Sequence, residues 1–226
     1  MEDFKSCRLG ISIVAVGQYG KDVLSDYKNN LKTKLEPEYF IEVYTEKDIE
    51  IIEKSDSSFF IVIGDMQDKN SKIIIDKLIK KDAKKYFLIK DMADITAPKV
   101  GIINVLKKQD ALNALEVLTY AFIKPGIICI DEADIWNLTK YGNFSTKNIK
   151  GTLEDVKDNI ANFDELTNAK AVLINIISKN TGLHEINIIA ESVQEKCSKD
   201  VAIIFYYTDA EKAHEKEFEL NLLYSI

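Results

Sequence analysis

Apolar runs alternate with amphipathic segments along the first half of the chain. Four apolar runs predict strands, at Leu9–Val16, Tyr39–Tyr44, Phe59–Ile63 and Tyr86–Ile89. The segments between them predict helices, at residues 22–35, in the acidic stretch that ends at Glu53, and at residues 72–81. Because the Phe59–Ile63 run does not alternate with polar residues, it predicts a strand that is covered on both faces. Alternating strands and helices predict a parallel sheet with helices on both faces.

The second half begins with a long helix and then becomes richer in strands. Residues 110–122 predict one helix with a broad apolar surface, which Pro125-Gly126 ends. Further helices are expected at residues 134–138, 152–162 and 186–196, and strands at Ala171–Ile177, Val201–Tyr207 and Glu217–Ser225. We therefore expect two lobes, residues 1–108 and 125–226, joined by a central helix over residues 109–124.

Composition and charge place the chain among ordinary globular proteins. Its 226 residues suffice for one large domain or two small ones, and 46% of them are hydrophobic, with only 3 Pro and 9 Gly. These values exclude the collagen-like, low-complexity and disordered classes. The formal net charge of −7 gives no global footprint for neutralising a phosphate backbone, so nucleic acid is not an expected partner.

The cysteines and the apolar segments indicate where the protein resides. Cys7, Cys129 and Cys197 form no C-x-x-C pair and leave one thiol over, which suits a reducing cytosol, and no metal site is expected. The first residues lack the shape of a signal peptide, and no apolar stretch approaches the ~18–20 residues of a spanning helix. We expect a cytoplasmic protein.

Two glycine-containing segments follow buried strands, where a helix N-terminus can favour a phosphate. The first, Gly17–Asp22, is not a Walker P-loop, since the G-x-x-x-x-G-K-[ST] spacing is absent and Asp22 follows Lys21. It does not match G-x-G-x-x-G either. A strand-to-helix turn that needs glycine for its backbone angles is the favoured alternative.

The second segment, Gly64–Asn70, holds one glycine and two aspartates. Asp65 and Asp68 would repel a phosphate. An aspartate pair can hold magnesium, although ordinary loop solvation is the favoured alternative.

An acidic run follows the central helix. In Pro125–Ile135 three carboxylates, Asp131, Glu132 and Asp134, fall within four positions directly after an apolar stretch. An acidic helix start explains them, because carboxylates gain about 0.3–1 kcal/mol from the dipole at a helix N-terminus. The functional alternative is a loop whose carboxylates polarise an attacking water.

The order of elements and the acidic run together resemble FtsZ and the wider tubulin-like GTPases. That family has a loop of the form P-G-(L/I)-I-N-V-D-F-A-D-V, which is similar to Pro125–Ile135 here, and its two aspartates fall on Asp131 and Asp134. Tyr141-Gly142 is similar to the family's M-G stretch, and Asn168–Ile176 is similar to its A-K-G-V-L-V-N-I strand. The resemblance is strongest from Ala111 to the end of the chain.

The resemblance implies a fold and an assembly mode. The fold is α/β and tubulin/FtsZ-like, with a Rossmann-like parallel-sheet N-terminal lobe, a central helix and a smaller α+β C-terminal lobe. In FtsZ the acidic loop of one subunit completes the GTP site of its neighbour, head to tail. The resemblance therefore assigns Asp131 and Asp134 to that catalytic role, and Cys129, Asp131, Glu132 and Asp134 to the subunit interface.

The departures from the family fall in the nucleotide-binding loops. The family loop V-G-G-G-G-G-N-A corresponds to Val16–Val23, which keeps only Gly17 and Gly20, and G-G-G-T-G-T-G is replaced by Gly64–Asn70. Cys129 stands where the family has asparagine. We expect a lobe that keeps the fold but has lost the pocket, with no bound cofactor. If GTP binds at all, Gly17, Gly20 and Gly64 are the expected contacts.

Three functions remain open. The leading hypothesis is a non-enzymatic FtsZ-like protein, a pseudo-GTPase of the cytoskeleton that self-assembles or docks on FtsZ through the Asp131–Asp134 loop. The alternative is a divergent tubulin-like GTPase that polymerises and hydrolyses GTP with Asp131 and Asp134 acting in trans. A scaffold with no filament role would instead form a monomer or a closed dimer. A role in bacterial cell division is implied by the resemblance alone.

Overall fold

The fold is seen in a computed structural model that describes residues 11–30, 40–43, 48–53, 59–79, 84–90, 100–105, 107–123, 130, 132–179, 181–209 and 217–226. The chain divides into two compact units, residues 1–116 and 117–226. The division falls inside helix α4 (Lys108–Ile123). The two units are described separately below.

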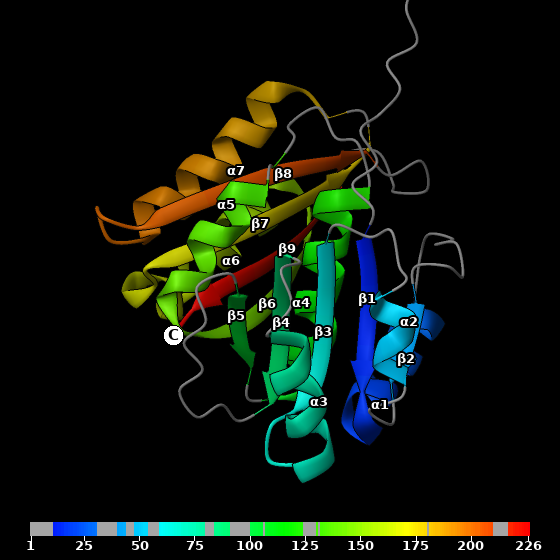
Figure 1. The fold of residues 1–226 in the computed structure, drawn as a ribbon. Coiled ribbons are helices and arrows are strands. Elements are labelled where there is room, and N and C mark those ends of the chain that lie inside the picture. The colour runs from blue at the N-terminus through cyan, green and yellow to red at the C-terminus, as the bar shows by residue number, and fades with distance from the viewer. Residues whose placement is uncertain are drawn as a thin grey trace, which may run out of the picture. The chain divides into compact units, whose positions relative to one another are not determined.

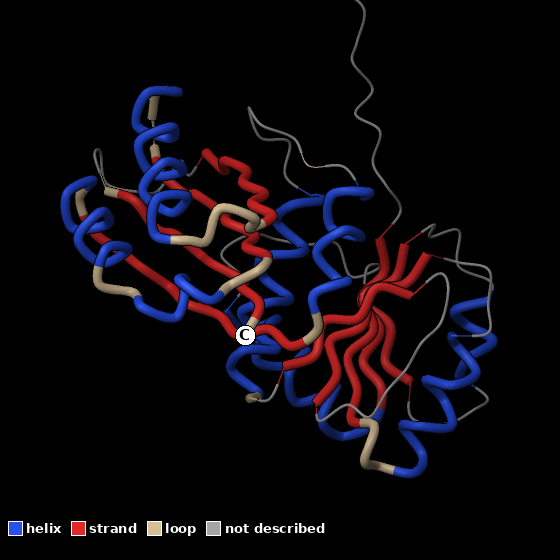
Figure 2. Tube along the Cα trace, turned by 90° about the vertical axis from the view of Figure 1, so that its left-hand side faces the viewer, coloured by secondary structure: helices blue, strands red, loops and turns tan. Residues whose placement is uncertain are grey.

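Unit 1 contains a five-stranded parallel sheet in the order β2-β1-β3-β4-β5 (Figures 1 and 2). The strands are β1 (Ile11–Val16), β2 (Phe40–Val43), β3 (Phe59–Asp65), β4 (Lys84–Lys90) and β5 (Val100–Val105). Helices α1 (Gly17–Asn30), α2 (Ile49–Glu53) and α3 (Lys69–Ile79) alternate with them. The parallel sheet predicted from the alternating pattern is therefore confirmed, and β5 is a strand that the pattern analysis missed.

The centre of unit 1 is formed by the two continuous apolar strands. The side chains of Ile13–Val16 in β1 and of Ile61–Ile63 in β3 are at most 1% exposed. The prediction that the Phe59–Ile63 run is buried is confirmed for Phe60–Ile63. Helix α1 turns Val23, Leu24 and Tyr27 toward this core, at a spacing that places them on one helix face.

Unit 2 contains a four-stranded mixed sheet in the order β6-β9-β7-β8 (Figure 1). Its strands are β6 (Asn143–Gly151), β7 (Ala171–Ser178), β8 (Ala202–Asp209) and β9 (Phe218–Ser225). Strand β9 runs antiparallel to both β6 and β7, whereas β7 and β8 are parallel. The helices are α5 (Glu132–Leu138), α6 (Leu153–Ala161) and α7 (Leu183–Lys196), with short 3-10 turns η3 (Thr139–Tyr141) and η4 (Asp164–Asn168).

The hydrophobic core of unit 2 lies between its sheet and helices α6 and α7. Seventeen buried residues form this cluster. They include Val156 and Ile160 of α6, and Ile186, Ile189 and Val193 of α7. The chain enters α6 through a capping box, in which the Thr152 side chain accepts from the Asp155 N–H and the Asp155 side chain accepts from the Thr152 N–H.

A row of polar side chains crosses the opposite face of the same sheet. Asn148, Asn221 and Asn175 lie opposite one another on β6, β9 and β7. The Asn148 side chain donates to Asn221 Oδ1, and Thr208 Oγ1 donates to Asn175 Oδ1 at 3.1 Å. A register shift of one residue would move these amides into the hydrophobic core, so the row favours a single register.

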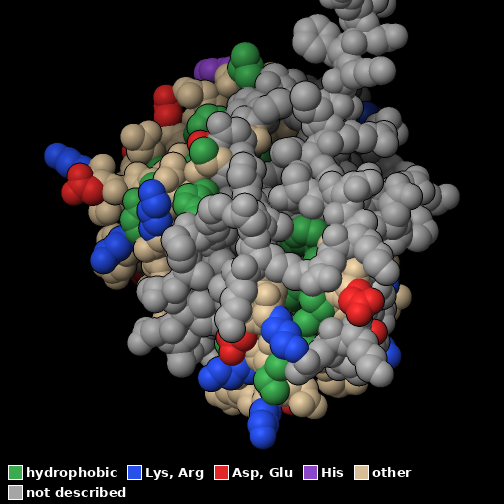
Figure 3. Space-filling view, in the orientation of Figure 1, with side chains coloured by type: hydrophobic (Ala, Val, Ile, Leu, Met, Phe, Trp, Pro, Cys, Tyr) green, Lys and Arg blue, Asp and Glu red, His purple; other side chains and the backbone are tan. Residues whose placement is uncertain are grey.

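The surface and the helix lengths bear on the expected partners. None of the described helices is both long and apolar enough to cross a membrane. On the face shown in Figure 3, the lysine side chains of the described residues are interspersed with aspartate and glutamate. The described residues of that face therefore form no continuous basic surface of the kind that binds a phosphate backbone.

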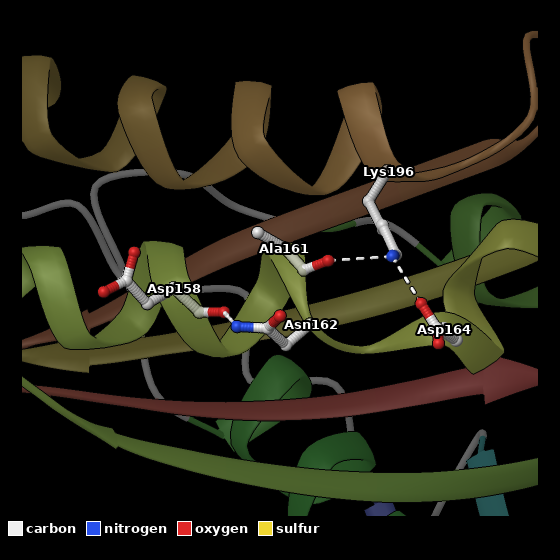
Figure 4. Close-up of polar contacts among 5 residues, drawn as sticks. All are labelled: Asp158, Ala161, Asn162, Asp164 and Lys196. Carbon is white, nitrogen blue, oxygen red and sulfur yellow. Dashed lines mark hydrogen bonds and ion pairs between the residues drawn. The ribbon is translucent and has the colours of Figure 1, made fainter.

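Lys196 ties the end of α7 to the end of α6 (Figure 4). Its ammonium group donates to the Ala161 carbonyl and to the Asp164 carboxylate, each at 2.8 Å. The Asn162 side chain donates to the Asp158 carbonyl at 2.8 Å, so side chains satisfy two carbonyls in the last turns of α6. The hydrogen bond and the charge of Lys196 lower the pKa of the Asp164 carboxyl.

Replacing Lys196 is expected to loosen this junction. Lys196→Met should lower the free energy of unfolding by about 1 kcal/mol, since the Ala161 carbonyl loses a charged donor. Urea denaturation measures the change, and Lys199→Met, at an exposed lysine just beyond α7, is the matched control.

The difference in free energy of unfolding between the Lys196→Met variant and the original protein should also depend on pH. The Asp164 pKa is lowered in the folded state, so its contribution is complete above the ordinary carboxyl pKa and is lost as pH falls through the lowered value. The gap in stability should therefore narrow in acid. A gap that widens in acid would contradict the ion pair.

Candidate functional site

The three glycines predicted to contact a nucleotide come together at the carboxyl ends of β1 and β3. Gly17 and Gly20 begin helix α1 directly after β1, and Gly64 lies near the end of β3. A Cβ added at Gly64 would lie 3.3 Å from the Cβ of Val16, which shows how close the two strand ends are. Open parallel sheets bind their ligands at such strand ends. We call this region the strand-end corner.

The predicted strand-to-helix turn that needs glycine for its backbone angle is confined to the junction at Gly17, and its predicted extent over residues 17–20 is corrected. These residues form the first turn of α1, which starts at Gly17 rather than at Asp22. Gly17 has a φ of +68°, which favours glycine. A Cβ at Gly20 would lie 2.4 Å from the Ile63 carbonyl oxygen and 3.1 Å from the Ala15 carbonyl carbon. Glycine is required there because α1 lies directly on the backbone of β1 and β3.

Gly64 also has a packing role. A Cβ at this position would lie 2.7 Å from Cδ1 of Ile75 in α3, and Ile75 is fully buried. The three retained glycines therefore share a structural cause, which is the close approach of two helices to the strand ends.

The segment after β3 also differs from its prediction. Helix α3 starts at Lys69, three residues earlier than expected, and Asp68 is its N-cap rather than a solvated loop residue. The Asp68 carboxylate accepts from the Ser71 N–H at 2.8 Å, and the Asp68 carbonyl accepts from the Lys72 N–H at 2.9 Å. The Ser71 hydroxyl, then the Ser71 N–H and, as a smaller effect, the Asn70 N–H lower the pKa of Asp68, outweighing partial desolvation.

Ser71 connects the starts of the two helices. It is buried at 1% exposure, and its Oγ lies 2.2 Å from where a Cβ of Gly17 would be. The Asp68 Oδ2 atom lies 3.7 Å from the same point. The sequence analysis missed Ser71, although the D-x-x-S spacing is that of an N-cap residue and its third helical position.

Asp65, the other aspartate of this segment, also bonds to the backbone. Its carboxylate accepts from the Gln67 N–H at 2.9 Å, which is the geometry of an Asx turn. The side chains of Asp65 and Asp68 thus take up N–H groups of the residues that follow them. In the family that the sequence resembles, this loop consists of glycine and threonine.

The acidic run is described only in part. Cys129 and Asp131 lie outside the described residues, and Glu132 is the first residue of α5. Helix α5 therefore starts two residues before the predicted Asp134, which is half-buried in its first turn. Ile135 and Leu138 anchor the helix in the core. The expected action of Asp131 and Asp134 on a neighbouring subunit stays a prediction.

Comparison with known proteins identifies the fold. No protein-family model matches the chain, and no curated protein sequence matches it. Among solved structures, an empty FtsZ dimer from M. jannaschii matches with a TM-score of 0.68 at 12% identity, covering 98% of this chain and 89% of that chain. CetZ1 from Haloferax volcanii, a GDP-bound monomer, matches with a TM-score of 0.64 at 10% identity. This match covers 96% of this chain and 94% of that chain.

A third similar structure is the GDP-form protofilament of TubZ from Bacillus thuringiensis serovar israelensis. Its TM-score is 0.57 at 10% identity, and the match covers 96% of this chain and 85% of that chain. Because all three matches span nearly the whole chain, the protein has an α/β fold of the tubulin/FtsZ type. The fold expected from the resemblance is thereby confirmed.

The packing of α1 can be tested at Gly20. Gly20→Ala should destabilise the protein by about 1–3 kcal/mol, because the new Cβ would overlap the Ile63 carbonyl. Thermal and urea unfolding measure the loss. Gly182→Ala is the control, since Gly182 has an ordinary φ of −81° and its added Cβ would meet only the flexible end of the Glu185 side chain. Equal effects of the two variants would contradict the packing role.

The cap on α3 can be tested at Asp68. Asp68→Ala should cost about 1 kcal/mol of stability at neutral pH, whereas Asp68→Asn should cost less because asparagine is also a good N-cap. The Asp68 pKa is lowered by folding, so its contribution is present above the ordinary carboxyl pKa and disappears as pH falls through the lowered value. Urea titrations of the original protein and the two variants, at neutral and at acidic pH, measure how far their free energies of unfolding converge in acid. If the gap between the original protein and the Asp68→Ala variant is the same at both pH values, the charged cap is excluded.

Proposed function

We propose that the protein is a non-enzymatic FtsZ-like subunit that self-assembles, or docks on an FtsZ-like filament, through the loop around Asp131–Asp134. The observation that carries the proposal is the Asp68 carboxylate on the first turn of α3. This turn follows the loop that stands where the related family has its glycine-rich phosphate loop. The chain supplies its own anion there.

The Asp68 cap opposes a nucleotide in two ways. A helix N-terminus binds phosphate through free N–H groups and the positive end of its dipole, and here the Ser71 N–H already donates to Asp68. A phosphate approaching this turn would also meet the negative charges of Asp65 and Asp68. Binding would require Asp68 to leave, which costs the helix its cap.

The retained glycines do not argue for a nucleotide. Gly17, Gly20 and Gly64 each lie too close to a neighbouring atom to accept a side chain without displacement. Packing of α1 and α3 therefore accounts for them without a ligand. The positions that became Gln18, Tyr19, Asp65 and Asp68 are those where the family loops carry further glycines or threonine.

Self-assembly is supported by solved structures that have the same fold. Two of the similar structures are an FtsZ dimer and a TubZ protofilament. The acidic run that resembles the FtsZ interface loop is retained in this sequence, and Asp134 lies half-buried in a helix anchored in the core of unit 2. A sequence that keeps the interface loop without a recognisable nucleotide pocket is what we expect of a filament component or regulator.

A divergent GTPase is the second candidate. Two of the similar structures are described with GDP, and the strand-end corner lies at the edge of the sheet where such folds hold ligands. If the protein is a GTPase, Gly17, Gly20 and Gly64 would contact the nucleotide. Asp131 and Asp134 would then polarise the attacking water at the nucleotide of a neighbouring subunit.

Sedimentation over a concentration series separates the two candidates. We expect the amount of pelleted protein, alone or with FtsZ, to be the same with GTP, with GDP and without nucleotide, and the pellet to contain no stoichiometric nucleotide. Asp131→Ala with Asp134→Ala should reduce pelleting, whereas Glu195→Ala, an exposed carboxylate on α7, should not. Pelleting that requires GTP and is accompanied by hydrolysis would replace the proposal with the GTPase. Failure to pellet under every condition would overturn both.

A further inference from the structure

The first turn of α3 carries two exposed lysines at a place where a helix favours acidic side chains. Lys69 is the first residue of α3 and Lys72 is the fourth, and both are exposed. The N-terminus is the positive end of the helix dipole, so a cation there is unfavourable. The first turns of α4, α6 and α7 each contain a carboxylate, whereas the first turn of α3 contains none. Helix stability therefore does not account for the two lysines.

Neither lysine is neutralised by a carboxylate of its own chain. The ion pairs of the described residues do not include Lys69 or Lys72. The carboxylates of Asp65 and Asp68, which are close in sequence, accept from backbone N–H groups instead. A conflict between the residue type and its local setting is expected mainly at functional sites. The two ammonium groups are therefore candidates for binding an anionic partner.

We propose that Lys69 and Lys72 bind the acidic run of a second copy of this chain, so that ion pairs join the two subunits directly. The inference rests on the proposed function, in which the Asp131–Asp134 loop forms a head-to-tail contact. In FtsZ this loop reaches the nucleotide site of its neighbour. Here Gly64–Asn70, which runs into the first turn of α3, takes the place of a loop of that site. The contact therefore brings the acidic loop to the two lysines.

The two surfaces have opposite charges. The acidic run supplies the carboxylates of Asp131, Glu132 and Asp134, and the first turn of α3 supplies the ammonium groups of Lys69 and Lys72. Residues three apart on a helix are neighbours on its surface, so carboxylates that are close in sequence can reach both lysines at once. Opposite charges across an interface steer association and fix the register of the partners. This complementarity favours a second copy of the chain as the occupant.

The Asp68 cap is compatible with this contact although it opposes a phosphate. A phosphate at a helix start needs the backbone N–H groups, one of which already donates to Asp68. A carboxylate that pairs with Lys69 and Lys72 needs only their ammonium groups. The subunits would then associate without a nucleotide, and the association would weaken as salt screens the charges. Because the two surfaces differ, the contact is heterologous and can continue along a filament.

Reversing the charge of the two lysines tests the contact by sedimentation of the full-length protein. Lys69→Glu with Lys72→Glu should raise the concentration needed for pelleting by about tenfold or more, because like charges then face each other. The same variant should unfold at no lower urea concentration than the original protein, since carboxylates suit a helix N-terminus. Lys170→Glu with Lys199→Glu, at exposed lysines of unit 2, is the control with an equal change in net charge.

A second variant with the opposite reversal makes the test specific for this pair of surfaces. Asp131→Lys with Asp134→Lys should also fail to pellet alone. A mixture of the two reversed proteins should pellet, since each loop then meets an α3 turn of opposite charge on the other protein. A folding defect in either variant would not be repaired by mixing.

The outcomes separate this inference from the proposed function. The ion pairs are overturned if Lys69→Glu with Lys72→Glu pellets like the original protein, or if a mixture of the two folded variants fails to pellet. The proposed function then stands where Asp131→Ala with Asp134→Ala still reduces pelleting. An original protein that pellets only in the presence of FtsZ overturns the second copy as the occupant. An original protein that never pellets overturns both proposals.

Discussion

The strand-end corner is the constraint on which unit 1 depends, because two helices begin there with almost no space between them. Helix α1 lies on the backbone of β1 and β3 at Gly20, and Ser71 of α3 lies against Gly17. The start of α3 is held by the Asp68 carboxylate, which takes up the N–H of Ser71. The same atoms thus fix both helices and fill the place where an anion would bind a free helix N-terminus.

This arrangement shows how an FtsZ-like fold would persist if, as we propose, it binds no nucleotide. Packing requires glycine at position 20, where a Cβ would overlap strand backbone; the positive φ of Gly17 favours glycine there, and a Cβ at Gly64 would displace the end of the Ile75 side chain. Phosphate binding makes a different demand, since it needs free N–H groups and a loop without opposing charge. Packing and phosphate binding therefore depend on different residues of the same loops. Substitutions such as those at Asp65 and Asp68 can abolish phosphate binding while the glycines that packing needs are kept.

Much of the fold could be predicted because its central strands are continuous apolar runs. β1 and β3 followed from that pattern, and the resemblance around Pro125–Ile135 indicated the fold at a level of 10–12% overall identity. β6 was missed because only Phe144 and Ile149 of its nine residues are buried. The starts of α1 and α3 were misplaced because Gly17, Gly20 and Asp68 are typical loop residues. Their helical role depends on contacts with distant strands, which local patterns do not contain.

In the proposed subunit, the Asp68 cap takes the place of a phosphate at the start of α3. Calorimetric titration of the purified full-length protein with GTP and with GDP, including Asp68→Ser beside the original protein, tests this claim most directly. We expect no saturable heat of binding from the original protein at millimolar nucleotide. Stoichiometric binding at micromolar GTP by the original protein, unchanged by Asp68→Ser, would contradict it.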